Sequence, residues 1–298
     1  MNKLNCYLEE NAFVAYLDDI SANMVAIENF ISTMESVDGA QVCNLYIPSN
    51  FYEIRTPDGE PTCQKIFALS ADRNTRDALL RLGAIIDKAK TYPDVNNAPL
   101  RGLRQLEMRQ AGGLISESAD KFDWWNDNQM YAICTPSDLK FALRKHYVNE
   151  LIDEKYFPSF CTHMFDNLYF SHQANTFGSL GVNYITHIKT FINHLSYLND
   201  DVTEHFSIAT TNLEKINRAA AFGVEISPES PLTRNNARAM RERYITISDQ
   251  SICCEWHTKI EPQRGRIHFN AQPNRPKNIT SIVGEKVIVG IFATHLLT

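Results

Sequence analysis

Several signatures of common protein classes are missing from this sequence of 298 residues. No run approaches 18 consecutive apolar residues, so the sequence predicts no membrane-spanning helix. It also contains no G-x-x-x-x-G-K phosphate loop, no G-x-G-x-x-G dinucleotide fingerprint and no G-x-S-x-G nucleophile elbow. These absences argue against a nucleotide-driven motor and against a common hydrolase.

Cysteine is also sparse. The seven cysteines are odd in number and none belongs to a C-x-x-C pair, so neither a disulfide framework nor a cysteine metal site is predicted. The beginning of the sequence, MNKLNCYLEENAFVAYLDD, carries acidic residues where a secretory signal would need a clean apolar run. We therefore expect a cytoplasmic protein with reduced thiols, no cofactor, no bound metal and no membrane partner.

The net charge of −6 is unevenly distributed along the sequence. Residues 231–298 carry ten Lys or Arg against five Asp or Glu, a local charge of +5, whereas the preceding residues carry −11. Attraction to phosphates depends on local cation density, so the basic segment predicts contact with a polyanion such as RNA or DNA. Docking of this segment onto the acidic remainder of the chain explains the asymmetry equally well.

Hydrophobic periodicity predicts an α+β fold in three regions: a mixed α/β layer at 1–95, a mainly helical region at 96–230, and a basic antiparallel β meander at 231–298. Helices are expected at 22–35, 74–90, 137–152, 183–198 and 211–223, strands at 41–47 and 63–69, and linkers at 92–102 and 224–233. His187 and His194 share one face of a predicted helix. No carboxylate stands at a ligand-like offset from them, so we interpret both as helix-surface residues.

Arginines dominate the start of the C-terminal region. A short helix capped by Thr233 would place Arg234, Arg238 and Arg241 along one side, with little acidic compensation. These three arginines and Arg264 are therefore our candidates for nucleic-acid contacts.

Alternating residues predict a β-hairpin with one polar face near the end of the sequence. Its strands, 252–260 and 266–270, are separated by the turn sequence EPQRG. The polar face would carry five side chains: Glu255, His257, Lys259, Arg266 and His268. A third strand at 286–297 is apolar on both faces, as expected of a covered strand, and ends in His295.

This polar face has the residues needed to cleave a phosphodiester without a metal ion. His257 and His268 would act as the acid–base pair, Lys259 and Arg266 would clamp the phosphate, and His295 would be a third histidine contributor.

Three other interpretations use the same residues. Glu255 and Lys259 loosely match the E-x-K strand of metal-dependent nucleases, but their spacing is two residues too long and only Asp249 offers a preceding acid. A metal site formed by the three histidines has no cysteine or carboxylate spacing to support it. In the third interpretation, which is not excluded by the sequence, the polar face forms salt bridges with the acidic remainder of the chain or with a partner chain.

The C-terminal residues resemble two groups of proteins. The basic hairpin with Lys259, Arg266 and His268, followed by an apolar strand ending in His295, is similar to the sheet of RelE-type mRNA interferase toxins over about a fifth of the chain. That resemblance implies RNA cleavage without metal. The pattern HTKI…GRIHF…VIVGIFATHLLT also resembles a signature of uncharacterised bacterial proteins found beside phage-defence genes. This second resemblance implies a cellular context of phage defence and no particular mechanism.

Together these observations predict a nucleic-acid-acting component of a bacterial antiviral defence or toxin system, with nuclease activity if the polar face is catalytic. The alternative is a non-catalytic subunit that uses the same face to bind a partner protein or nucleic acid within a defence complex.

Overall fold

The computed structural model describes residues 1–70, 73–92, 112–117, 130–174, 176–272 and 275–297. Its α+β fold agrees with the prediction, and the chain forms two compact units, Met1–Ile152 and Asp153–Thr298. The expected boundaries after residues 95 and 230 therefore fall inside these units. Most of the expected linker at 92–102 lies outside the described residues. Within the described residues, no helix combines the length and apolar character needed to cross a bilayer.

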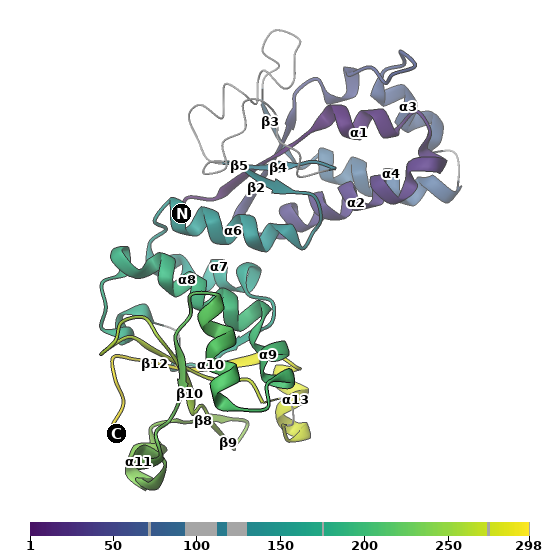
Figure 1. Ribbon diagram of the computed structural model, residues 1–298. Coiled ribbons are helices and arrows are strands. Elements are labelled where there is room, and N and C mark those ends of the chain that lie inside the picture. Colours follow the sequence, from purple (N-terminus) through teal and green to yellow (C-terminus); the bar gives the residue numbers. More distant parts are fainter. Residues whose placement is uncertain (71–72, 93–111, 118–129, 175, 273–274, 298) are drawn as a thin grey trace. The chain divides into compact units, whose positions relative to one another are not determined.

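The first unit is built on a five-stranded parallel sheet (Figure 1). In spatial order its strands are β3 (Lys90–Tyr92), β2 (Cys43–Pro48), β1 (Leu4–Leu8), β4 (Gly112–Ile115) and β5 (Met130–Ile133). The prediction of a strand at 41–47 is confirmed by β2. Apolar residues of β1, β2 and β4 are buried on both faces, as expected when helices connect parallel strands.

Among its described residues, the helices that accompany this sheet are α1 (Glu10–Tyr16), α2 (Ile20–Gly39), α3 (Thr62–Leu69), α4 (Arg73–Ile86) and α6 (Asp138–Asn149). The side chain of Asp19 caps α2 by accepting from the backbone N–H of Ala22. The strand predicted at 63–69 is wrong, because this segment forms α3. A short apolar run does not distinguish a strand from a helix, and the buried Thr62 starts a helical turn here.

The strand order reverses between β1 and β4, and two acidic residues follow these strands. Glu9 follows β1 and is 6% exposed; burial raises its pKa to about 7. Glu117 follows β4 and accepts a hydrogen bond from the Tyr16 hydroxyl. In open parallel sheets such a reversal is where ligands usually bind.

The second unit contains a mixed five-stranded sheet. Its order is β6 (Leu168–Phe170), β12 (Val287–Ala293), β11 (Arg266–Asn270), β10 (Trp256–Lys259) and β7 (Ile226–Pro228). Only the β6–β12 pair is parallel, so the predicted antiparallel character holds for the remaining pairs. The segment expected as a linker at 224–233 instead contributes the edge strand β7.

The long strand predicted at 252–260 is divided in two. Its first half is β9 (Gln250–Cys253), which pairs with β8 (Tyr244–Ile247), while its second half is β10 in the main sheet. The chain changes sheet between them, at Cys254 and Glu255. Backbone pairing with two different partners, rather than the alternation of side chains, decides this break.

Helices cover one face of the second sheet: α8 (Tyr184–Asp200) and α9 (Val202–Ile208), with α7 (Phe157–Met164) and α10 (Asn212–Ala221) nearby (Figure 1). Phe206 of α9 packs on Trp256 and Phe269, with ring centroids 4.9 and 5.8 Å apart. The capping box predicted at the start of 211–223 is confirmed by Thr211 and Glu214.

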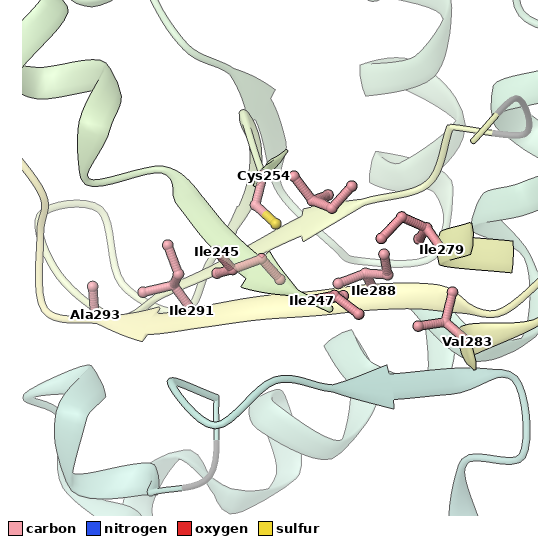
Figure 2. Close-up of a cluster of buried hydrophobic side chains, with 9 residues drawn as sticks. Ile245, Ile247, Cys254, Ile279, Val283, Ile288, Ile291 and Ala293 are labelled. Carbon is pink, nitrogen blue, oxygen red and sulfur yellow. The ribbon is translucent and has the colours of Figure 1, made fainter. Parts of the chain in front are cut away.

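On the other face, the β8–β9 hairpin and α13 (Lys277–Val283) enclose a separate apolar cluster. Figure 2 shows Ile245 and Ile247 of β8 beside Ile288 and Ile291 of β12. Cys254 completes the cluster close to Gly290: a Cβ added at this glycine would overlap the Cys254 sulfur. This close approach explains why a glycine interrupts an otherwise apolar strand.

The arginine-bearing helix predicted after Thr233 is divided as well. It forms α11 (Pro231–Asn235) and α12 (Ala237–Arg241), separated by Asn236 in an extended conformation. The cap of α11 is Ser230, whose side chain accepts from the N–H of Thr233, so the predicted cap Thr233 is wrong. Asn236 in turn caps α12.

Candidate functional site

The β10–β11 hairpin brings two histidines together. His257 and His268 occupy paired positions of the antiparallel ladder, and their ring centroids are 5.0 Å apart. Paired residues project from the same face, so the predicted alternation places both rings side by side. The ladder is irregular between His268 and Phe269, where β12 inserts an extra residue. Such bulges change the direction of side chains and are frequent near functional sites.

A carboxylate lies beside this histidine pair. Glu229 directly follows β7, and its Oε1 atom lies 3.6 Å from Nδ1 of His257 and 3.8 Å from Nδ1 of His268. Sequence reasoning missed Glu229 because it stands between two prolines in a segment interpreted as a linker. The pairing of β7 with β10 brings it here: His257 is opposite Ser227, two residues before Glu229.

Arg243 holds Glu229 in place through an ion pair. Its Nε donates to Oε1 of Glu229 at 2.9 Å, and its Nη1 donates to the Ala239 carbonyl at 2.7 Å. The side chains of Arg243 and Glu229 are only 2% and 5% exposed. The pair is therefore a buried ion pair, which fixes the carboxylate toward the histidines.

These residues line a cavity of about 220 Å³. Its walls come from β7, β10, β11, α11 and the C-terminal segment, and they consist of Ser227, Pro228, Glu229, Ser230, Thr233, Arg243, His257, Lys259, Arg266, His268, His295 and Leu296. All five residues predicted to be catalytic are in this group. Strand alternation therefore located His257, Lys259, Arg266 and His268, and the end of the third predicted strand located His295, whereas the other lining residues were not predicted as part of a site.

Burial controls the protonation of the central groups. It would raise the pKa of Glu229, but the nearby His257 and Arg243 outweigh it and lower the pKa to about 2. Burial lowers the pKa of His257, although Glu229 opposes the shift. Burial, assisted by His257, lowers the pKa of His268 to about 3. At neutral pH both histidines are therefore neutral, so His268 is poorly suited to the predicted role of proton donor.

The two predicted phosphate-clamping residues already have protein partners. Lys259 forms an ion pair with the exposed Glu225. Arg266 donates to the backbone carbonyls of Glu261, Pro262 and Arg264, at distances between 2.6 and 3.0 Å. Arg266 therefore braces the turn that joins β10 and β11, whereas Lys259 can exchange an exposed partner for a ligand.

The other candidates lie farther from the histidine pair. His295 is exposed and lines the cavity. Glu255 does not line it and instead pairs with Arg234 at 3.4 Å. Arg264 pairs with Glu261 at 2.8 Å and is 56% exposed.

Arg238 and Arg241 are exposed on α12. The expected stripe of three arginines along one helix is wrong, because Arg234 belongs to α11 and Asn236 breaks the helical path. The basic surface at this position is therefore formed by two short helices rather than one.

A third histidine supports the hairpin from the helical side of the sheet. His194 of α8 is 2% exposed, and its Nδ1 lies 2.9 Å from the Thr258 hydroxyl, between the two site residues of β10. The interpretation of His194 as a helix-surface residue is wrong. His187, on the same helix, is partly exposed and pairs with Glu261 at 3.0 Å.

Comparison of the chain with protein-family models, with curated proteins and with solved structures found no match.

Proposed function

We propose that this protein is a cytoplasmic, nucleic-acid-acting component of a bacterial antiviral defence or toxin system, and that it cleaves phosphodiester bonds in the cavity beside His257 and His268. The observation that supports this proposal most directly is the convergence of two neutral histidines, a buried carboxylate and three cationic side chains on one cavity.

His257 has the environment of a general base. It is neutral, its Nε2 lies 3.1 Å from the Ser227 hydroxyl, and its Nδ1 faces Glu229 at 3.6 Å. A carboxylate beside a histidine orients the ring and stabilises the imidazolium that forms when it accepts a proton. His257 would take the proton of the attacking water or ribose hydroxyl, while the exposed His295 or solvent supplies a proton to the departing oxygen.

The cations of the cavity suit the charge of the substrate. With the histidines neutral, Glu229 and Arg243 compensate each other, and Lys259 and Arg266 leave the lining positive. A phosphodiester carries one negative charge, which increases at the phosphoryl oxygens during attack. Lys259 is the cation best placed to bind it, since its present partner Glu225 is exposed.

Cleavage assays with purified full-length protein test this proposal. Labelled RNA and DNA, single- and double-stranded, are incubated with wild type and with the His257→Ala, His268→Ala and Lys259→Ala variants. We expect cleavage by wild type and a loss of at least 100-fold on removal of His257, the range typical of a general base. His187→Ala is the matched control, because this histidine also pairs with a glutamate but does not line the cavity. Uncut substrates, or a His257 variant as active as wild type, would contradict the proposal.

A non-catalytic role in a protein complex is favoured by one observation. Arg243 and Arg266 are both already bound within the protein, as in a polar network that shapes a surface. In that case the exposed Arg238 and Arg241 would contact nucleic acid or a partner subunit. Binding without cleavage, lost in the Arg238→Ala/Arg241→Ala double variant and retained in His257→Ala, would support this alternative.

A further inference from the structure

We infer that Glu229, His257 and His268 form a binding site for one divalent transition-metal ion of the zinc class. This inference deepens the proposed function, on which it rests for the use made of the ion: with the ion bound, His257 would be a ligand, and a metal-bound hydroxide would replace it as the group that accepts the proton. The sequence predicted no metal because no carboxylate accompanied the histidines. The structure supplies that carboxylate from β7.

The donor set and its geometry fit such an ion. One ligand atom from each of the three residues lies within 4.8 Å of the other two. Ligands at about 2.0–2.1 Å from a tetrahedral zinc ion stand roughly 3.4 Å apart, so a closure from 4.8 Å, by at most about 1.4 Å, completes the site. Two histidines and one glutamate are an established donor set for zinc ions that keep a fourth position open.

The ring nitrogens of His257 have the division of roles that metal ligands show, whereas the His268 nitrogen that lies 3.8 Å from Glu229, Nδ1, also contacts a backbone carbonyl. His257 Nε2 contacts the Ser227 hydroxyl at 3.1 Å, and His268 Nδ1 contacts the Cys254 carbonyl at 3.3 Å. The remaining nitrogens, Nδ1 of His257 and Nε2 of His268, are buried and have no hydrogen-bond partner among the described residues. Orientation of a metal-binding ring through its second nitrogen is a general feature of such sites.

Nδ1 of His257 gives the more specific argument. When Nε2 donates to Ser227, Nδ1 presents a lone pair toward the carboxylate oxygen of Glu229, 3.6 Å away. In this tautomer two electron-rich atoms face each other in a buried position, and either a proton on Nδ1 or a metal ion between them removes the repulsion. His268 is 1% exposed, which leaves little room for solvent to fulfil that role on its side.

The charges around the site determine what else binds there. Arg243 already neutralises Glu229, so an added divalent ion makes the cavity strongly positive. An anionic fourth ligand would offset this charge, and the cavity of about 220 Å³ has room for one beside Lys259. The open position therefore suits a phosphoryl oxygen of the substrate or a metal-bound hydroxide.

Metal titration without nucleic acid tests the inference separately from cleavage. Full-length protein is dialysed against chelator and then titrated with Co²⁺, whose visible absorption reports a tetrahedral environment, and with Zn²⁺ in competition. We expect one ion per chain and displacement of Co²⁺ by Zn²⁺. His257→Gln and Glu229→Gln should lose this binding, and Ser227→Ala should weaken it by about 10-fold, as for other residues that orient a ligand.

Controls separate this site from other metal-binding groups of the chain. His187→Gln removes a histidine paired with a glutamate outside the cavity and should bind Co²⁺ as wild type does. Because Glu229→Gln affects a buried ion pair, its circular dichroism and unfolding midpoint are compared with those of His257→Gln, whose side chain is 12% exposed. A folded His257→Gln variant that binds Co²⁺ like wild type overturns the inference, as does a wild type without tetrahedral Co²⁺ absorption.

The two hypotheses fail in different ways. Cleavage of nucleic acid by chelated protein would leave the proposed function standing and refute the metal ion's part in it. Tight Co²⁺ binding at these residues without cleavage of RNA or DNA would refute the proposed function and leave the metal site standing.

Discussion

The buried ion pair between Arg243 and Glu229 makes the most demanding prediction about the second unit. Its two side chains are almost completely shielded from water, and Arg243 is among the largest fully buried side chains of the described chain. Three variants examine it: Arg243→Met, Glu229→Leu and the double substitution. Each replaces a charged group by an apolar side chain of similar length.

The expected loss of unfolding free energy depends on which charged side chain remains buried without its partner. In Glu229→Leu the buried guanidinium keeps the Ala239 carbonyl at 2.7 Å but loses the carboxylate at 2.9 Å, and Glu242 is too far away at 3.9 Å to replace it. Breaking a buried pair in this way costs about 3–5 kcal/mol of unfolding free energy. The double variant leaves no unpaired charge, so we expect it to be more stable than either single variant and the coupling energy to exceed about 2 kcal/mol.

Equilibrium unfolding in urea, followed by circular dichroism, measures these free energies. The pair formed by Arg264 and Glu261 is a control with almost the same N–O distance, 2.8 Å, but with side chains 56% and 29% exposed. Its double-mutant cycle should give a coupling of less than about 1 kcal/mol, since water screens exposed pairs.

Additive effects of the two substitutions on the unfolding free energy would refute a strongly coupled buried ion pair. If the Arg243→Met and Glu229→Leu single variants each lose less than about 1 kcal/mol and the double variant loses their sum, the charges are not held together in a water-poor environment. The orientation of Glu229 toward the histidines would then lose its physical basis.

Three further predictions concern other parts of the second unit. Gly290→Ala should destabilise it by about 1–3 kcal/mol in urea unfolding, because the new methyl group meets the Cys254 sulfur; a neutral effect would contradict the close packing. Burial lowers the pKa of His194 from 6.5 to about 4, so the unfolded chain binds the proton first and stability falls as the pH drops from 6.5 toward 4, by up to about 3 kcal/mol. Calorimetry of His194→Gln should show a smaller loss over that range, and an unchanged slope would refute the assignment. Replacing Arg238 and Arg241 by alanine should reduce the slope of log K against log salt for nucleic-acid binding by about 1 per residue; an unchanged slope would exclude them from phosphate contact.

Local sequence patterns predicted much of the secondary structure correctly. Helices α2, α6 and α8 were recognised because apolar residues recur at helical spacing over more than two turns, α10 was recognised by its capping box, and α4 was predicted as well. The segment 63–69 was assigned wrongly because its apolar run is too short to reveal its period. The sequence placed α6 in the middle region, whereas its packing on β5 and the contact of His146 with the Asn2 carbonyl place it in the first unit.

The candidate site was partly accessible from the sequence. Alternation in 256–259 and 266–270 placed His257, Lys259, Arg266 and His268 on one face, and the register of β10 and β11 agrees with that placement. The same pattern did not show that this face is covered. Arg266 and His268 are 5% and 1% exposed, because the carbonyls of the β10–β11 turn surround Arg266 while Glu229 and the Cys254 carbonyl lie against His268, contacts that alternation does not encode.

The sequence by itself determined that His257, Lys259, Arg266 and His268 share one face of the hairpin, since side chains alternate with a two-residue period along each strand. Only the tertiary structure decided what that face contains. It added Glu229 through the pairing of β7 with β10 and Arg243 from the chain after α12, and it excluded Glu255, which turns toward Arg234. It also removed the two histidines from water, which determines whether they are charged. Strand pairing and burial depend on residues distant in the sequence, and these two properties turn a polar face into a candidate site.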